Sequence, residues 1–250
     1  MNLILENCPV CSSRHLHYSF TLKDHRVVRC DECALMMINP QPLNETLETI
    51  YGSDYFVFSH SDLGRIHADE LKSSTANRYL NQLLSGDEDL TNKVLLEVGC
   101  GSGDFLVSAA LQGLSVVGVE YSSHACETTH RKLAKNGAKF EIIQGDISIV
   151  ENSSHLGKYD YVVFCDVIEH VRDPRYFIKV VNQLLKPGGK FFCAVPSLDS
   201  WSARLLKTNW MEFKLEHLFY FNAKNLKSIF FQEGFSDFTL IPSKKTLSIG

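Results

Sequence analysis

The fold of this chain is decided by the stretch Val94-Leu-Leu-Glu-Val-Gly-Cys-Gly-Ser-Gly-Asp-Phe105. Its first five residues are apolar except for Glu97, which is the pattern of a buried parallel strand. Alternating glycines follow, and apolar residues then recur from Phe105 to Leu111 at helical spacing. Strand, glycine turn and helix form the opening unit of a doubly wound α/β sheet, in which a ligand lies across the carboxyl ends of the strands.

The turn itself contains Gly99, Gly101 and Gly103, spaced as G-x-G-x-G. Glycine permits positive φ and lets a ligand approach the bare backbone. The spacing differs from the G-x-G-x-x-G dinucleotide fingerprint, and the turn lacks the Gly-Lys-Ser/Thr of a P-loop. Taken alone, the turn also fits a structure without a ligand or a site for a different nucleotide.

Composition restricts the class of protein. The 250 residues are 44% hydrophobic and 22% charged, which suits one large globular domain or two unequal ones. A net charge of −4 disfavours a surface built mainly to bind nucleic acid. No apolar run approaches the ~20 residues that span a bilayer, and the first residues do not resemble a signal peptide. With eight cysteines, these features predict a cytoplasmic protein without a membrane partner.

Two C-x-x-C pairs near the N-terminus predict a metal site. They are separated by 18 residues, as in the C-x₂-C-x₁₅₋₂₀-C-x₂-C pattern of structural zinc. Four thiolates satisfy the tetrahedral preference of zinc and leave no open position for chemistry. A redox dithiol and a disulfide staple are the alternatives. We therefore expect a zinc ribbon over residues 1–40, with Cys8, Cys11, Cys30 and Cys33 as ligands.

The remaining strands of the sheet follow in order after the glycine turn. Buried strands are predicted at 114–119, 140–144 and 159–165, with helices between them, and a Pro-Gly-Gly turn leads to a fifth strand. Glu120 ends the first of these strands, where a carboxylate can accept hydrogen bonds from both ribose hydroxyls of a nucleotide.

Several of these segments match one family. Leu96-Glu-Val-Gly-Cys-Gly-Ser-Gly-Asp104 resembles motif I of the class I S-adenosylmethionine-dependent methyltransferases. Gly145-Asp-Ile147, Asp166-Val-Ile-Glu-His-Val171 and Leu184-Leu-Lys-Pro-Gly-Gly-Lys-Phe-Phe-Cys-Ala-Val-Pro196 resemble its later motifs, in the correct order. Asp166–Val171 is similar to the segment found in enzymes that act on small molecules.

The resemblance implies a Rossmann-like, seven-stranded methyltransferase sheet preceded by a small zinc ribbon. It also implies S-adenosylmethionine as methyl donor and a small-molecule acceptor, which could be an activated sugar. The residues that it assigns to the cofactor are Glu97, Gly99, Cys100, Gly101, Gly103, Glu120, Tyr121, Asp146, Ile147, Asp166 and Val167.

A long insertion after the fifth strand predicts a lid over residues 197–222. It contains Glu216 and His217, and a second histidine, His170, follows the strand at 159–165. Either histidine could remove the acceptor's proton, and Glu216 could orient His217. Each histidine could instead be structural, bonded to the backbone.

The expected organisation is a zinc ribbon at 1–40, a helical cap at 41–92 and the methyltransferase domain at 93–250. Tyr51, Tyr55 and Phe56 are expected either to cover the cofactor or to pack between domains. A sixth strand is predicted at 235–241 and a seventh from Thr246, which suggests a truncated C-terminus.

The sequence leaves two alternatives to methylation of a small molecule. A zinc-ribbon RNA methyltransferase is disfavoured by the acidic net charge, because RNA binding requires phosphate neutralisation and base stacking. A non-catalytic scaffold is disfavoured by the intact glycines and by the acids at Glu120 and Asp146.

Overall fold

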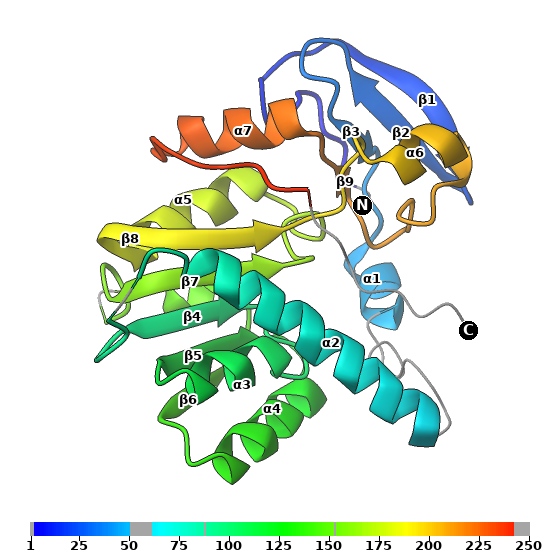
Figure 1. Ribbon diagram of the computed structural model, residues 1–250. Helices are drawn as coiled ribbons and strands as arrows, with labels where there is room; N and C mark the ends of the chain where they lie inside the picture. The colour runs from blue at the N-terminus through cyan, green and yellow to red at the C-terminus, as the bar shows by residue number, and fades with distance from the viewer. Residues whose placement is uncertain (1–2, 51–61, 88, 153, 243–250) are drawn as a thin grey trace. The chain divides into compact units, whose positions relative to one another are not determined.

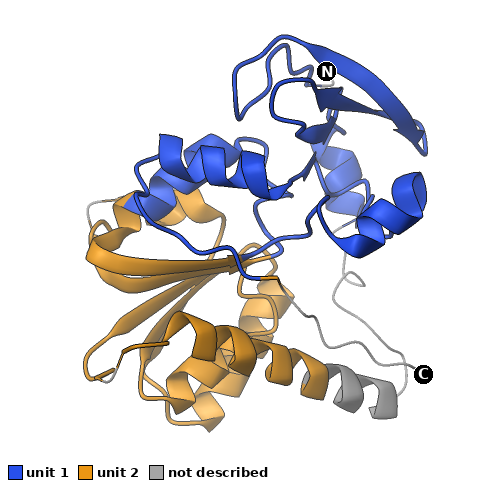
Figure 2. Ribbon diagram, turned by 45° about the horizontal axis from the view of Figure 1, so that its top comes forward, with its two compact units in different colours: residues 1–52, 166–182, 194–241 blue, residues 53–165, 183–193, 242–250 orange. Residues whose placement is uncertain are grey.

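The computed structural model describes residues 3–50, 62–87, 89–152 and 154–242, with only the backbone of residues 62–69. The chain forms two compact units, each assembled from separate segments (Figure 2). Unit 1 comprises residues 1–52, 166–182 and 194–241, and unit 2 comprises residues 53–165, 183–193 and 242–250.

Unit 2 is built on a five-stranded sheet with the strand order β6-β5-β4-β7-β8 (Figure 1). The pairs β4–β5, β4–β7 and β5–β6 are parallel. The apolar runs of β4, β5 and β7 are buried because these strands occupy the interior of the sheet, whereas β6 at the edge is partly exposed. The strands are β4 (Val94–Val98), β5 (Ser115–Glu120), β6 (Phe140–Gln144), β7 (Tyr159–Cys165) and β8 (Leu185–Ala194).

The helices of unit 2 alternate with these strands. Helix α3 (Asp104–Leu111) packs on β5, and helix α4 (Ser123–Lys135) packs on β6 (Figure 1). Ser122 caps α4, since its hydroxyl accepts a hydrogen bond from the amide of Ala125 at 3.3 Å. Helix α2 (Asp62–Leu83) precedes the sheet, and the short η1 (Ile147–Val150) follows β6.

Unit 1 contains a four-stranded sheet with the order β1-β2-β3-β9. Strands β1 (Leu16–Leu22), β2 (His25–Cys30) and β3 (Met36–Ile38) form the predicted ribbon. The fourth strand, β9 (Phe219–Tyr220), comes from the predicted lid and pairs antiparallel with β3. The sequence pattern did not predict this pairing, because it joins segments more than 180 residues apart.

The helices of unit 1 begin at recognisable signals. Helix α5 (Pro174–Leu184) starts with proline, and the carboxylate of Asp173 accepts from the amide of Tyr176 at 3.0 Å. A capping box between Asn222 and Asn225 starts α7 (Ala223–Gln232). The remaining helices are α1 (Asn44–Ile50), α6 (Trp201–Leu206) and η2 (Lys207–Asn209).

The predicted seven-stranded sheet is wrong for the described residues, which form a sheet of five strands. No strand occurs at 235–242, and the expected seventh strand lies outside the described residues. The physical reason is that Phe235 and Phe238 pack on α7 instead of extending the sheet. Their rings lie 5.5 and 5.9 Å from the ring of Phe230, measured between centroids.

Other expectations were closer to the structure. The strands at 140–144 and 159–165 have the predicted bounds. The fifth strand begins earlier than predicted, because β8 includes the Pro-Gly-Gly residues that were expected to form a turn before it. Tyr51, Tyr55 and Phe56 lie outside the described residues. Among the helices described, none combines the length and apolar character needed to cross a bilayer.

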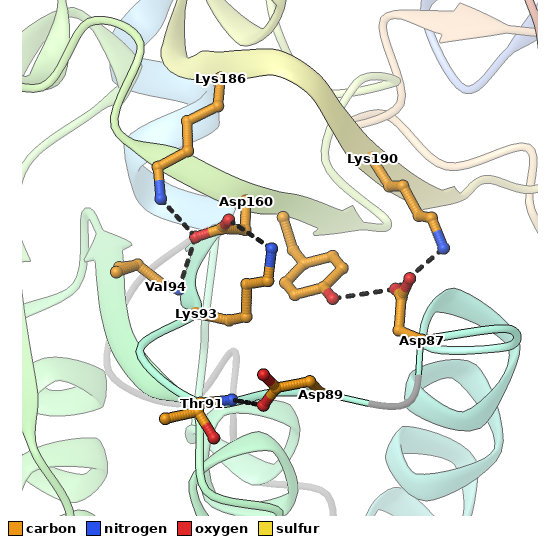
Figure 3. A network of polar contacts seen from close by, with 9 residues as sticks. Asp87, Asp89, Thr91, Lys93, Val94, Asp160, Lys186 and Lys190 are labelled. Atoms are coloured by element: carbon orange, nitrogen blue, oxygen red, sulfur yellow. Dashed lines mark hydrogen bonds and ion pairs between the residues drawn. The ribbon is translucent and has the colours of Figure 1, made fainter.

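A buried carboxylate ties three segments of unit 2 together (Figure 3). Asp160 of β7 is 8% exposed and accepts hydrogen bonds from Lys186 Nζ at 2.7 Å and Lys93 Nζ at 3.2 Å. The amide of Val94 also donates to it at 2.9 Å. Burial alone would raise the pKa of Asp160, but these hydrogen bonds lower it overall.

We predict that Asp160→Asn lowers the free energy of unfolding by about 1–3 kcal/mol at neutral pH, because charge-assisted hydrogen bonds are lost. The lowered pKa means that this contribution is present above the unfolded-state pKa and is lost as pH falls through the folded-state pKa. Urea denaturation of both proteins should therefore show a difference that shrinks in acid. Glu141→Gln, on the exposed face of β6, is the control and should show no such difference.

Candidate functional site

The glycine turn after β4 has the left-handed backbone that its sequence predicted. Gly99, Gly101 and Gly103 have φ values of 72°, 50° and 77°. A Cβ on Gly103 would lie 2.5 Å from the side chain of Thr129, whereas a Cβ on Gly101 would have nothing within 4 Å. Gly103 is therefore required by packing, and Gly101 leaves open space at the backbone.

Glu120, at the end of β5, is bonded directly to this turn. It is 7% exposed, and its Oε2 accepts a hydrogen bond from the amide of Gly101 at 2.9 Å. Its Oε1 accepts from the amide of Ser122 at the same distance. A carboxylate oxygen has further lone pairs, so both oxygens can still accept from a ligand. The structure thus brings the predicted ribose-binding acid against the glycine turn.

Glu97 lies buried in β4 and is 5% exposed. Burial and the nearby acids Asp104 and Glu120 raise its pKa well above the usual value, which favours a protonated carboxyl group. Its Oε2 has no hydrogen-bond partner within the described part of the chain. A buried polar atom without a partner is costly, and a ligand that supplies one would remove this cost. Cys100 is also buried, and burial raises the pKa of its thiol.

The third predicted cofactor segment follows β6. The amide of Gly145 donates to the carbonyl of Glu120 at 2.9 Å, which places the ends of β5 and β6 side by side. Asp146 caps η1 by accepting from the amide of Ser148 at 2.8 Å. Ile147 is buried, whereas Tyr121 is 68% exposed. These residues share the carboxyl edge of the sheet with the glycine turn.

Asp166 and Val167, the remaining cofactor candidates, start the loop that follows β7, and they lie in unit 1. Asp166 has a φ of 54°, a left-handed conformation that is uncommon for a residue with a side chain. Its amide donates to the carbonyl of Ala194 at 2.8 Å, and the carbonyl of Val167 accepts from the amide of His170 at 2.9 Å. Strained residues of this kind cluster at ligand-binding and active sites.

The two candidate histidines meet within unit 1. Their ring centroids lie 4.7 Å apart in an edge-to-face arrangement. The carboxylate of Glu169 joins them, since ligand atoms of Glu169, His170 and His217 all lie within 4.8 Å of one another. Glu169 is 1% exposed and His217 is 4% exposed. We call Glu169, His170 and His217 the histidine cluster.

The backbone of Glu216 bonds to this cluster. Its carbonyl oxygen lies 3.0 Å from Nδ1 of His170, so Nδ1 carries the proton and donates. Burial, more than any other effect, lowers the pKa of His170, and the ring is therefore neutral at neutral pH. A neutral ring with a protonated Nδ1 leaves the lone pair on Nε2, where it can accept a proton.

Two residues of this region were not predicted. Glu169 follows the apolar residues Val167 and Ile168, and a charged residue directly after a buried strand and these residues was the available signal. Arg172 anchors the same loop by donating to the side chains of Gln41 and Asn44 and to the carbonyl of Pro42, at 2.6–3.1 Å. No sequence spacing indicated these contacts.

The four ribbon cysteines converge as predicted. Sγ of Cys8 lies 3.5 Å from Sγ of Cys33, and Sγ of Cys11 lies 3.4 Å from Sγ of Cys30. Tetrahedral bonds of about 2.3 Å to zinc would place such sulfurs about 3.8 Å apart, so the set fits the ion after a small adjustment.

The two halves of this site share one backbone conformation. The residue after each C-x-x-C pair is left-handed, with a φ of 59° at Ser12 and 61° at Ala34. The hydrogen bond between the thiols of Cys8 and Cys33 is the largest cause of two opposite shifts, since it lowers the pKa of Cys8 and raises the pKa of Cys33. Cys8 is therefore the thiol of this pair that ionises first.

Comparisons with known proteins agree with this geometry. A family model described as "Methyltransferase domain" matches residues 69–240. The ubiquinone biosynthesis O-methyltransferase of Vibrio atlanticus is 34% identical over 115 residues, covering 45% of this chain and 47% of that protein. The corresponding protein of Yersinia pestis is 33% identical, covering 45% and 46%. The chain thus matches about half the length of these curated relatives.

Solved structures of similar fold include the magnesium protoporphyrin IX methyltransferase of Synechocystis with bound S-adenosylhomocysteine. Its TM-score is 0.63 at 18% identity, covering 81% of this chain and 94% of that one. Phosphoethanolamine N-methyltransferase 2 of Haemonchus contortus, in complex with S-adenosyl-L-methionine, has a TM-score of 0.57 at 21% identity, covering 81% and 47%. With the family match over more than half of its residues, the chain belongs to the class I S-adenosylmethionine-dependent methyltransferases.

Proposed function

We propose that this protein transfers a methyl group from S-adenosylmethionine to a hydroxyl oxygen of a small molecule, with His217 as the general base. The observation that carries the proposal is the histidine cluster, two imidazole rings beside a buried carboxylate. The names of the curated relatives support O-methylation. Methylation of a carbon in an activated sugar is the alternative.

The chemistry needs little from the protein at the methyl group itself. The sulfonium of the donor already makes its methyl carbon electrophilic. The protein has to align the acceptor with the S–CH₃ bond and remove the acceptor's proton. A neutral imidazole suits the second task, because its usual pKa lies near neutral pH.

The structure gives the members of the histidine cluster different roles in this proposal. His170 is held by the carbonyl of Glu216 and packs edge-to-face on His217, so it can fix the orientation of the neighbouring ring. The carboxylate of Glu169 can stabilise the imidazolium that forms when His217 takes the proton. The sequence suggested that Glu216 orients His217. Its carbonyl accepts from Nδ1 of His170, and its charge opposes the lowering of the His170 pKa by burial, so Glu216 can also support the cluster.

For the donor, we propose that the glycine turn passes beneath its methionyl part and that Glu120 accepts from its ribose. Open space at Gly101 and the free lone pairs of Glu120 support this assignment. Asp146 and Ile147, at the neighbouring strand end, are proposed to contact the adenine. Glu97, whose Oε2 is buried, is proposed to bond to the donor or to a water beside it.

We further propose that the four cysteines hold structural zinc and that residues 1–40, 41–92 and 93–250 act as ribbon, cap and methyltransferase domain. The convergent thiols support the zinc assignment. We also propose that the protein works in a reducing compartment such as the cytoplasm, where thiols stay available to bind metal.

The first experiment is a screen of acceptors for release of S-adenosylhomocysteine by the zinc-loaded protein. The panel contains a catechol, a nucleotide-linked sugar and a short RNA hairpin. Turnover of either small molecule supports the proposal. Turnover of the hairpin alone, with affinity that falls steeply as salt is added, would instead identify an RNA methyltransferase.

We predict that Gly101→Ala weakens binding of S-adenosylmethionine at least about tenfold, because a Cβ would occupy the open space at the turn. Gly137→Ala is the matched control, since Gly137 is also left-handed and also faces open space. Both variants should lose about 1–2 kcal/mol of stability from backbone strain. Calorimetry that shows equal affinity for the two variants would contradict the proposed site.

We predict that His217→Ala lowers kcat about 10²–10⁴-fold while affinity for S-adenosylmethionine stays nearly unchanged, since general bases contribute factors of this size. Unchanged turnover on the true acceptor would remove His217 from the mechanism. His170→Gln, which keeps a hydrogen-bonding side chain but no base, should cost less than His217→Ala.

We predict that Glu169→Gln lowers kcat and moves the acid limb of the kcat/KM profile to lower pH. A base works only when it is neutral, so activity falls as pH drops through its pKa. Removing a nearby carboxylate destabilises the imidazolium and lowers that pKa. Glu48→Gln removes an exposed carboxylate of α1 in the same unit and should leave the profile unchanged. Identical profiles for both variants would argue against the role of Glu169.

A further inference from the structure

The cysteine ribbon and His217 belong to one sheet of unit 1. Strand β9 begins two residues after His217 and pairs with β3, Phe219 opposite Met37 and Tyr220 opposite Met36. The pairing extends toward the histidine, because the amide of Ile38 donates to the carbonyl of Leu218 at 3.0 Å. The ribbon backbone therefore contacts the residue next to His217.

Side-chain packing repeats this connection. Leu215 and Tyr220, which flank His217 in sequence, share a buried cluster with Val27 of β2 and Ile38 of β3. The ring of Phe213 lies 4.7 Å from the rings of both Phe20 and Tyr220, measured between centroids. We call residues 213–221 the histidine segment, and both its ends pack on the ribbon strands.

A second connection runs through the start of α7. The side-chain amide of Asn222 donates to the carbonyl of Cys33 at 3.3 Å, and Lys224 Nζ donates to the carbonyl of Glu32 at 3.3 Å. Both acceptors lie in the second C-x-x-C turn. The histidine segment is thus attached to the ribbon through β9 and, just beyond its end, through α7.

The ribbon combines a small buried core, which includes Val27, Met37 and Ile38, with strands that are short or exposed. β3 has three residues and β9 has two, and β1 is exposed or half-exposed along its whole length. Short strands of this kind are marginal without further support. In small domains built around cysteine ligands, the free energy of metal binding supplies much of the folding free energy.

From these contacts we propose that the cysteine ribbon is the scaffold that positions His217, so that binding of a metal ion by the four thiols orders the histidine segment. In this proposal the ribbon positions His217 within unit 1. The consequence for turnover rests on the proposed function. The structural coupling itself does not.

The coupling is tested by hydrogen–deuterium exchange on the full protein, with zinc bound and after zinc removal by dipicolinate. We expect amides of the histidine segment to exchange at least tenfold faster after removal, together with those of β2. Amides of β4 and β5 in unit 2 should keep their protection. Retained protection of the histidine segment, or equal loss in β4 and β5, would overturn the proposal.

Kinetics provide an independent readout. Cys11→Ser should bind S-adenosylmethionine with unchanged affinity and lose at least tenfold in kcat, whereas Cys193→Ser, a matched change in β8, should resemble the wild type. Equal kcat in the two variants would overturn the proposal. If the wild type transfers no methyl group, the proposed function fails, and the exchange experiment still decides the coupling.

Two lysine variants in α7 test the connection between this helix and the metal site. Lys224→Met removes the donor to Glu32, whereas Lys227→Met removes a lysine one turn further along, above the ring of Phe231. Zinc transfer to a chromogenic chelator should be several-fold faster from Lys224→Met than from Lys227→Met. Equal rates would show that α7 does not support the metal site.

Discussion

Residues 218–220 are buried, so their backbone amides and carbonyls need hydrogen-bond partners within the protein. The segments that supply these partners form the centre of unit 1. The carbonyl of Glu169 accepts from the amides of both Leu218 and Phe219, at 2.8 and 3.2 Å. On the other side, β3 of the ribbon pairs with β9. Because one short stretch bonds to both neighbours, the loop after β7, the histidine segment and the ribbon are held together.

This arrangement explains why the histidine cluster exists. Glu169 and His170 lie on a loop that Arg172 anchors to residues 41–44, and His217 lies on a segment held by the ribbon. Three side chains from two distant parts of the sequence reach the same place because the backbone of Glu169 is bonded to that of Leu218 and Phe219. In unit 2 a hydrogen bond likewise holds two distant segments together, since the Glu120 carboxylate accepts from the amide of Gly101 in the glycine turn.

Sequence reasoning succeeded where a feature is local. Apolar periodicity and glycine spacing act over a few neighbours, so β6 and β7 were predicted with the bounds that the structure shows. It failed at the sixth strand, because Phe235 and Phe238 can either extend a sheet or pack on a helix. Apolar side chains suit both outcomes, and only the position of α7 decides between them.

By itself, the sequence determined the strand–glycine–helix unit, the two C-x-x-C pairs and the acids at the strand ends, since each depends on spacing within one short segment. The tertiary structure decided that the predicted lid supplies a strand to the ribbon, and that Glu169 lies beside both histidines. Both depend on hydrogen bonds and packing between segments more than 40 residues apart, such as Glu169 with Leu218 and Phe219. Such contacts depend on which distant segments become neighbours in the folded chain, and a pattern within one short segment carries no information about that.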